Sequence, residues 1–117
     1  MIDLAALITN CKEASVSGNK TLRMLRKTKL GKEEKELLMA ASRGIGAFYF
    51  CSMDPIPGAW IRAGSRQFLD KQDHASNAKY LEAFQSLCKR GYIEHRSGRL
   101  FVLTVSGYER AARLAKG

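Results

Sequence analysis

Prolines, histidines and cysteines are scarce in this chain of 117 residues, which has two, two and three of them. Zinc sites usually contain a close pair of ligands such as C-x₂₋₄-C, whereas Cys11, Cys51 and Cys88 lie 40 and 37 positions apart. A zinc ion would need scattered ligands, with Cys51 and Cys88 joined by His74 and His95. An odd number of widely spaced cysteines is also a poor disulfide framework and indicates a reducing compartment. We therefore expect no metal, no cofactor, and three cysteines packed as small apolar groups.

Long hydrophobic runs are absent as well. The longest run, from Ile45 to Cys51, is interrupted by Gly46 and is far shorter than the roughly 20 residues that a helix needs to cross a bilayer. Near the N-terminus, Asp3 stands where a signal peptide would carry basic residues. The length and the 45% hydrophobic content suit one globular domain. These features predict a soluble, cytoplasmic protein with no membrane partner.

Acidic residues are outnumbered: 20 lysines and arginines stand against 11 aspartates and glutamates, which gives a net charge of +9. Residues 1–32 hold seven basic and two acidic residues, a net charge of +5. Residues 33–75 hold five basic and six acidic residues, a net charge of −1. Residues 76–117 hold eight basic and three acidic residues, again a net charge of +5. Two basic segments attract polyanions such as nucleic acids, although a small domain can carry a net charge of about 2–8 for solubility alone.

The clearest predicted helix covers residues 75–90. Its apolar stripe recurs at helical spacing and is expected to face a core; the residues of the stripe are Asn77, Tyr80, Leu81, Phe84, Leu87 and Cys88. Asp73 or Ser76 can cap the start of this helix, and Gly91 ends it. The basic residues that suit the negative end of its dipole are Lys89 and Arg90. Its solvated face is predicted to be Ser76, Lys79, Glu82, Ala83 and Ser86.

Two hairpins are predicted, one within residues 45–63 and one within residues 92–104. In the first, a turn over residues 54–58 separates two short aromatic strands; in the second, the chain turns around Ser97 and Gly98. The fold class is therefore mainly α with a small antiparallel β component, an α+β fold. The remaining predicted elements are helices over residues 2–14, 21–29, 32–44 and 106–115, and one helical turn over 65–70. The apolar side of the last helix is predicted to be Tyr108, Ala111, Ala112 and Leu114.

The second half of the chain carries a more specific pattern. Tyr80-Leu81-x₂-Phe84-x₂-Leu87-x₃-Gly91-Tyr92-Ile93 is followed by Gly98-Arg99-Leu100-Phe101-x-Leu103-Thr104-x₂-Gly107-Tyr108. This order resembles the C-terminal half of prokaryotic winged-helix domains, in which a recognition helix stops at a glycine and leads into a β-hairpin, the wing. The resemblance covers residues 33–115 in order and is sharpest over 78–110. It implies a three-helix core with a wing over residues 32–117, preceded by a basic helical extension over residues 1–31.

The chain departs from this pattern just before the long helix. A helix-turn-helix motif normally has a regular supporting helix there, but residues 64–73 are short and polar, and the hairpin of residues 45–63 precedes them like an insertion. Either the supporting helix is a single turn buttressed by Phe68 and Leu69, or the hairpin replaces it.

The resemblance implies that the protein binds duplex DNA, as a transcriptional regulator or nucleoid-type factor, mainly through phosphate contacts. The candidate residues on the long helix and the wing are Ser76, Lys79, His95, Arg96 and Arg99. Further phosphate contacts are expected from Arg23, Arg26 and Lys27 in the N-terminal segment. The alternative for the wing residues is that their charge protects an edge strand. The DNA-binding prediction requires Lys79, Arg96 and Arg99 to share one cationic surface.

The aromatic hairpin supports a second interpretation. Phe48, Tyr49, Phe50 and Trp60 crowd this segment, and such residues most often form core. A partly exposed Tyr49 or Trp60 would instead mark a partner surface. The alternative function is a non-enzymatic protein–protein interaction module that uses the winged-helix scaffold and this hairpin to bind a protein partner or a second copy.

Catalytic constellations are not recognisable in the sequence. His74 and His95 have no convincing nucleophile partner, and a polar loop accounts for Asp70 and Asp73 beside His74. The pattern of a phosphate-binding glycine loop and that of a nucleophile elbow are both missing. We therefore expect no enzymatic activity.

Overall fold

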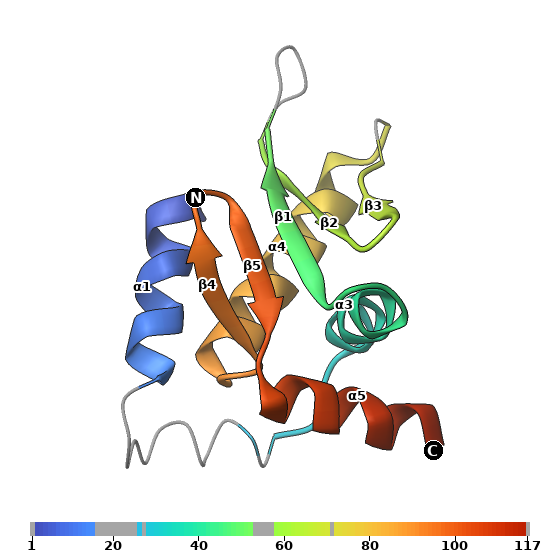
Figure 1. The fold of residues 1–117 in the computed structure, drawn as a ribbon. Coiled ribbons are helices and arrows are strands. Elements are labelled where there is room, and N and C mark those ends of the chain that lie inside the picture. The colour runs from blue at the N-terminus through green and yellow to red at the C-terminus, as the bar shows by residue number, and fades with distance from the viewer. Residues whose placement is uncertain (1, 16–25, 27, 53–57, 71, 117) are drawn as a thin grey trace.

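The computed structural model describes residues 2–15, 26, 28–52, 58–70 and 72–116, in which two helices are followed by three strands, a long helix, a two-stranded hairpin and a last helix (Figure 1). The expected α+β class is confirmed, because the four described helices pack with a five-stranded antiparallel sheet. The elements are α1 (Leu4–Ala14), α3 (Lys32–Arg43), β1 (Ala47–Cys51), β2 (Trp60–Ala63), β3 (Arg66–Phe68), α4 (His74–Lys89), β4 (Ile93–Ser97), β5 (Leu100–Leu103) and α5 (Val105–Lys116). The basic helix expected over residues 21–29 lies outside the described residues, apart from Arg26, Thr28 and Lys29. No described helix combines the length and the apolar character that a bilayer crossing requires.

Strand β1 lies at the centre of the sheet, whose order is β3-β2-β1-β5-β4. Phe48 on β1 stands opposite Ala63 on β2 and Phe101 on β5. Both predicted hairpins are confirmed, because β1 pairs with β2 and β4 pairs with β5 in antiparallel register. Gly98, at the turn of the second hairpin, has a φ of +51°, a conformation that favours glycine.

The helical turn expected over residues 65–70 is wrong, because Arg66–Phe68 form β3 instead. Gly64 has a φ of +61°, which allows a two-residue turn between β2 and β3. Phe68 then lies opposite Ile61 and is 3% exposed. A segment this short cannot offset the cost of nucleating a helix, whereas pairing with β2 satisfies its backbone. A short edge strand therefore lies where a single helical turn buttressed by Phe68 and Leu69 was one of the two expected arrangements.

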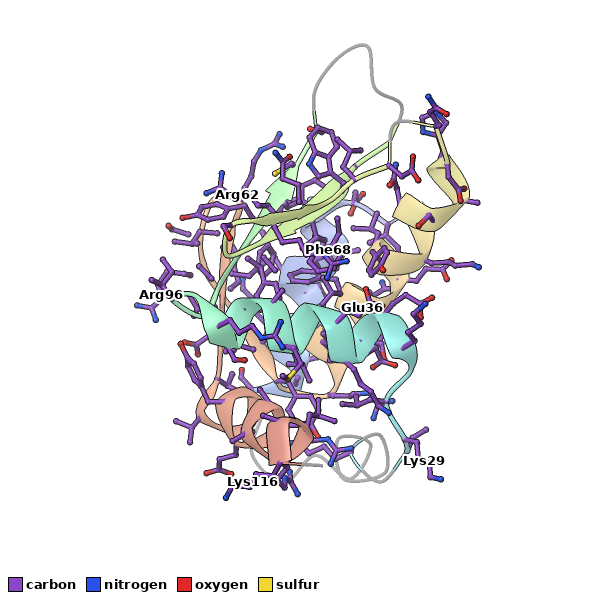
Figure 2. The ribbon with its side chains drawn as sticks, turned by 90° about the vertical axis from the view of Figure 1, so that its right-hand side faces the viewer. Lys29, Glu36, Arg62, Phe68, Arg96 and Lys116 are labelled. Atoms are coloured by element: carbon purple, nitrogen blue, oxygen red, sulfur yellow. The ribbon has the colours of Figure 1, made fainter. Side chains whose placement is uncertain are left out.

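One face of the sheet, the inner face, is covered by helices, with α4 running behind the strands in Figure 1. Phe84 on α4 packs edge-to-face against Phe48 and Phe101, with ring centroids 5.2 Å apart in both pairs. All three rings are fully buried, and such aromatic pairs add stability beyond their buried area. No described helix lies over the opposite, outer face, from which Arg62 and Arg96 project (Figure 2).

The stripe and the caps predicted for the long helix are confirmed in α4. Asp73 caps its start by accepting a hydrogen bond from the Ser76 backbone N–H at 3.1 Å. Ala83 is an exception: it was expected on the solvated face but is 8% exposed. The reason is that α3 packs on that side, where Tyr80 and Ser86 both donate hydrogen bonds to α3.

Helix α1, which the sequence analysis assigns to a separate extension, packs against α4 and β4. Leu7 and Cys11 belong to the same hydrophobic core as Phe84. Cys11 and Cys88 are buried, as expected, while Cys51 is half-buried.

Helix α5 crosses the end of the sheet and packs on α3. Its buried residues are Gly107 and Ala111. Tyr108 and Ala112 are exposed, although they were expected on the apolar side. Because α5 lies at the rim of the molecule, it buries a narrower stripe than the pattern of its apolar residues indicates.

Candidate functional site

The exposed face of α4 is the first candidate surface. Lys79 is exposed on it, and Ser76 is half-buried beside the helix start. Asp70 is held at this place because the Asn77 side chain accepts from the Asp70 N–H at 2.6 Å and donates to the Asp70 carbonyl at 3.0 Å. Together with the capping Asp73, it brings two exposed carboxylates to the N-terminus of α4. Phosphate would be repelled there, so this end of α4 is a poor match for a DNA backbone.

Glu82 lies one turn after Lys79 on the same exposed side of α4. The two charges are of opposite sign, and the exposed residues of α4 include no cluster of arginine, asparagine or glutamine that could read base edges in a major groove. Asn77 is buried, and its side-chain amide makes two hydrogen bonds to the Asp70 backbone, so it does not face a DNA base.

Two candidate residues of the β4–β5 hairpin, His95 and Arg96, make contacts within that hairpin. The His95 ring lies edge-to-face on Phe101 at 5.1 Å, and its Nε2 is 2.9 Å from the Gly98 carbonyl oxygen. Arg96 forms a 3.5 Å ion pair with Glu94.

Arg96 and Arg99 point to different sides of the sheet. Arg96 projects from the outer face (Figure 2). Arg99 donates to the Ser52 hydroxyl at 2.9 Å and lies over the ring of the inward-facing Phe50. Lys79 belongs to α4, behind the inner face. Lys79, Arg96 and Arg99 therefore do not form the single cationic surface that the DNA-binding prediction requires.

The N-terminal candidates divide into described and undescribed residues. Arg23 and Lys27 lie outside the described residues. Arg26 donates from Nε to the Arg90 carbonyl at 2.9 Å and stacks over the Tyr92 ring. It thereby satisfies a carbonyl at the C-terminal end of α4, a structural role in line with the helix dipole.

Arg90, expected only to complement the dipole at the end of α4, has a structural role that the sequence pattern did not predict. It is only 4% exposed and pairs with Glu34 at 2.9 Å. It also donates to the carbonyl oxygens of Thr28 at 2.7 Å and Lys29 at 3.4 Å. Arg90 thus ties the end of α4 to the start of α3 and to the segment before it. Of this network, the sequence pattern indicates only the role of Glu34 as a helix-capping residue. Glu34 lies three residues after Gly31 and accepts a hydrogen bond from the Gly31 N–H at 3.1 Å.

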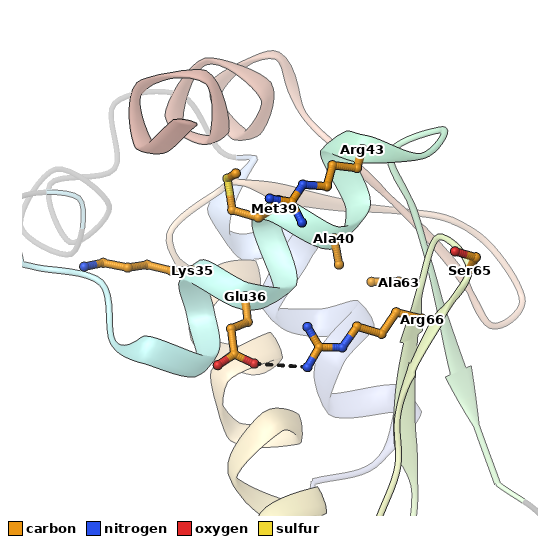
Figure 3. A pocket seen from close by; sticks show the side chains of 8 residues that line it. All are labelled: Lys35, Glu36, Met39, Ala40, Arg43, Ala63, Ser65 and Arg66. Atoms are coloured by element: carbon orange, nitrogen blue, oxygen red, sulfur yellow. Dashed lines mark hydrogen bonds and ion pairs between the residues drawn. The ribbon is translucent and has the colours of Figure 1, made fainter. Parts of the chain in front are cut away.

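A groove lies between α3 and the turn that joins β2 to β3 (Figure 3). Its volume is about 430 Å³, and the charged side chains that line it are Lys35, Glu36, Arg43 and Arg66. Glu36 pairs with Arg66 at 3.4 Å and accepts a hydrogen bond from the Tyr80 hydroxyl. That hydrogen bond raises the pKa of Tyr80 to about 12, so the phenol stays protonated at neutral pH.

Burial also raises the pKa of two of the three thiols, Cys51 and Cys88. Burial raises the pKa of Cys51 more than the neighbouring Arg62 and Arg99 lower it. Burial, together with the adjacent Cys11, raises the pKa of Cys88 well above its ordinary value. Among residues 2–15, 26, 28–52, 58–70 and 72–116, no group of three His, Cys, Asp or Glu side chains is arranged to hold a metal ion.

An exposed apolar surface spans the outer face of β1 and the start of α5. Ile45, Val105 and Tyr108 are 80%, 76% and 45% exposed. The Tyr108 hydroxyl donates to the Ile45 carbonyl at 3.3 Å, and its ring lies so close to Gly46 that a Cβ there would be 1.8 Å from the hydroxyl oxygen. These contacts place Tyr108 beside Ile45.

The surface continues across the outer face through Tyr49 and Arg62. The Arg62 guanidinium lies 4.9 Å from the centroid of the Tyr49 ring. A depression of about 310 Å³ joins these two residues to Ile45. We call Ile45, Tyr49, Arg62, Val105 and Tyr108 the β1–α5 patch.

The β1–α5 patch agrees only in part with the aromatic surface considered in the sequence analysis. Tyr49 is half-buried, as that interpretation requires, but Trp60 is 5% exposed and donates from Nε1 to the Gln67 side-chain oxygen at 3.1 Å. Ile45, Val105 and Tyr108 were missed. Their apolar character is visible in the sequence, but their exposure depends on where α5 packs.

Comparison with models of known protein families, with curated proteins and with solved structures finds no match for this chain.

Proposed function

We propose that this protein is a non-enzymatic interaction module that binds a protein partner through the β1–α5 patch. The observation that carries this proposal is the exposure of three large apolar side chains in one place, Ile45, Val105 and Tyr108. Adjacent exposed apolar side chains of this kind mark interaction sites on protein surfaces. The patch also contains the residue types that dominate binding energy at such sites, tyrosine and arginine.

Side-chain contacts within the patch support the same function. Tyr108 is fixed by its hydrogen bond to Ile45 and by its contact with Gly46, and Arg62 stacks on Tyr49. Side chains ordered before binding lose little conformational entropy when a partner docks. A partner of a different kind is favoured over a second copy, because two chains with a net charge of +9 repel each other.

Duplex DNA binding by α4 and the wing, which the winged-helix resemblance implies, stays a prediction. The carboxylates at the start of α4 and the separation of Lys79 from Arg96 both weigh against it.

Site-specific photo-crosslinking in the native host tests the proposed function. A benzophenone amino acid at Val105 is expected to give one dominant protein adduct. The matched control carries it at Lys79, which is also exposed but lies on α4, behind the inner face of the sheet, and is expected to give none of that adduct. The substitution Ile45→Asp, at a position that is 80% exposed and therefore tolerant, should abolish the Val105 adduct.

The expected loss is large enough to measure. A central apolar contact in an interface contributes about 2 kcal/mol, which corresponds to roughly 30-fold in Kd. Identical adducts from both positions, an adduct that survives Ile45→Asp, or no adduct at all would contradict the proposal, and an adduct of twice the chain mass would identify a second copy instead.

A further inference from the structure

Acidic residues begin and basic residues end two neighbouring helices, so that opposite charges lie toward opposite ends of the molecule. Helices α1 and α4 run side by side in the same direction (Figure 1). Each begins with an aspartate cap, Asp3 and Asp73, and each has a lysine in its last turn, Lys12 and Lys89. Acids at helix starts and bases at helix ends complement the helix dipole. Because the two helices run in the same direction, their aspartate caps lie toward one end of the molecule and their C-terminal lysines toward the other.

The basic end carries more cations than the helix dipoles account for. Lys29 and Lys116 lie at the same end of the molecule (Figure 2). Lys29 belongs to the segment held by Arg90, and Lys116 to α5, which crosses this end and packs on α3. We call this surface the cationic end, and its exposed members are Lys12, Lys29, Lys32, Lys89, Arg113 and Lys116.

Carboxylates neutralise the cationic end only partly. The acidic residues within four positions of these bases, apart from Glu34, are Glu13, Glu33, Glu36 and Glu109, fewer than the six bases. Glu34 is turned inward, because it pairs with Arg90 and accepts from the Ser86 hydroxyl at 3.0 Å. Among the described residues, no carboxylate forms an ion pair with Lys29, Arg113 or Lys116.

The spacing of these cations indicates what kind of anion they suit. They come from the last turns of α1, α4 and α5 and from the start of α3 and the segment that leads into it, an arrangement suited to an extended anion more than to a single phosphate. A nucleic-acid duplex presents about one charge per 3.4 Å along each strand and can contact several at once. Stacking platforms for single strands need exposed aromatics among the cations, and the one strongly exposed aromatic of the described chain, Tyr108, belongs to the β1–α5 patch.

We propose that the cationic end binds the phosphate backbone of a nucleic-acid duplex, without reading bases. This surface differs from the one that the winged-helix resemblance implies, because it uses α5 and the segment before α3 in place of the start of α4 and the wing. It is also separate from the β1–α5 patch, so the proposal does not depend on the proposed protein partner.

Fluorescence anisotropy with the full chain and a labelled 20-base-pair DNA of arbitrary sequence tests the proposal. The variant Arg113→Gln/Lys116→Gln removes two cations from the cationic end, and the matched control Lys79→Gln/Arg96→Gln removes two from the surfaces of the winged-helix prediction. All four side chains are exposed, and unchanged circular dichroism verifies that the variants fold.

The expected result is quantitative. Each lost phosphate contact lowers the slope of log K against log salt by about 0.9. The α5 variant should therefore lower the slope by about 1.8 and weaken binding roughly 60-fold at about 0.1 M salt, whereas the control should change both only slightly. An RNA duplex of the same sequence in a parallel titration distinguishes the two sources of duplex phosphate.

Three outcomes overturn the proposal. Equal losses in the two variants would mean that binding follows net charge alone. A loss confined to the control would assign the DNA to α4 and the wing. No binding by the unmodified chain to either duplex at low salt would remove nucleic acid as a ligand, and would leave the crosslinking result at Val105 unaffected.

Discussion

Replacing the buried Arg90 by methionine is the sharpest test of how this fold is held together. The Arg90 side chain is 5% exposed and pairs at 2.9 Å with Glu34, whose side chain is 12% exposed. Arg90→Met keeps most of the side-chain volume but leaves the Glu34 charge buried without its partner. It also removes the donors to the carbonyls of Thr28 and Lys29. Breaking a buried pair from one side costs about 3–5 kcal/mol, a large share of a typical stability of about 5–15 kcal/mol.

Urea denaturation at pH 7 measures this cost. With an m-value of about 1–3 kcal/mol/M, the midpoint should fall by at least about 1 M. The control is Arg96→Met, because the Arg96–Glu94 pair is 61% and 53% exposed and contributes about 0–1 kcal/mol. The double variant Glu34→Gln/Arg90→Met should be more stable than Arg90→Met, since no buried charge is left. If Arg90→Met costs no more than Arg96→Met, the network around Arg90 does not hold the ends of α3 and α4 together.

Two further predictions concern a tyrosine and a glycine. The hydrogen bond to Glu36 raises the pKa of Tyr80 from its ordinary 10.0 to about 12. Because the folded-state pKa lies above the unfolded value, this bond stabilises the fold below pH 10 and is lost as the pH rises toward 12; absorbance titration at alkaline pH should show Glu36→Gln moving the late tyrosine transition to lower pH. Gly107→Ala should lower the thermal midpoint by an amount equivalent to about 1–3 kcal/mol, since a Cβ there would lie 2.2 Å from the Tyr92 carbonyl oxygen. An increase in stability, which helix propensity alone favours, would refute that contact.

The two proposed surfaces differ in chemical character and lie at different places on the molecule. The β1–α5 patch is apolar and aromatic and lies on the uncovered side of β1 and at the start of α5, while the cationic end begins at the other end of α5. Val105 and Lys116 are about 16 Å apart along the helix axis at 1.5 Å per residue. A protein partner and a duplex could therefore be held by one chain at the same time, with α5 between them.

Most of the secondary structure was predictable because its signals are local. In α4, the apolar stripe, the capping Asp73 and the terminating Gly91 all lie within the segment that they organise. The β4–β5 hairpin was predictable for the same reason, since its strands flank a tight turn. By contrast, the three residues of β3 are too few to show a period, and their strand conformation depends on pairing with β2. The sequence alone could not distinguish this arrangement from a helical turn.

By itself, the sequence determined the α+β class, the placement of the helices and hairpins, and the excess of basic residues in two segments. Only the tertiary structure decided which charged groups share a surface. Lys89 and Arg90 are neighbours at the end of the same helix, and local rules treat them alike. Packing turned Arg90 inward against Glu34 and left Lys89 in solvent. The physical reason is that electrostatic energy depends on distance and burial in space, and neither is encoded in the spacing of residues along the chain.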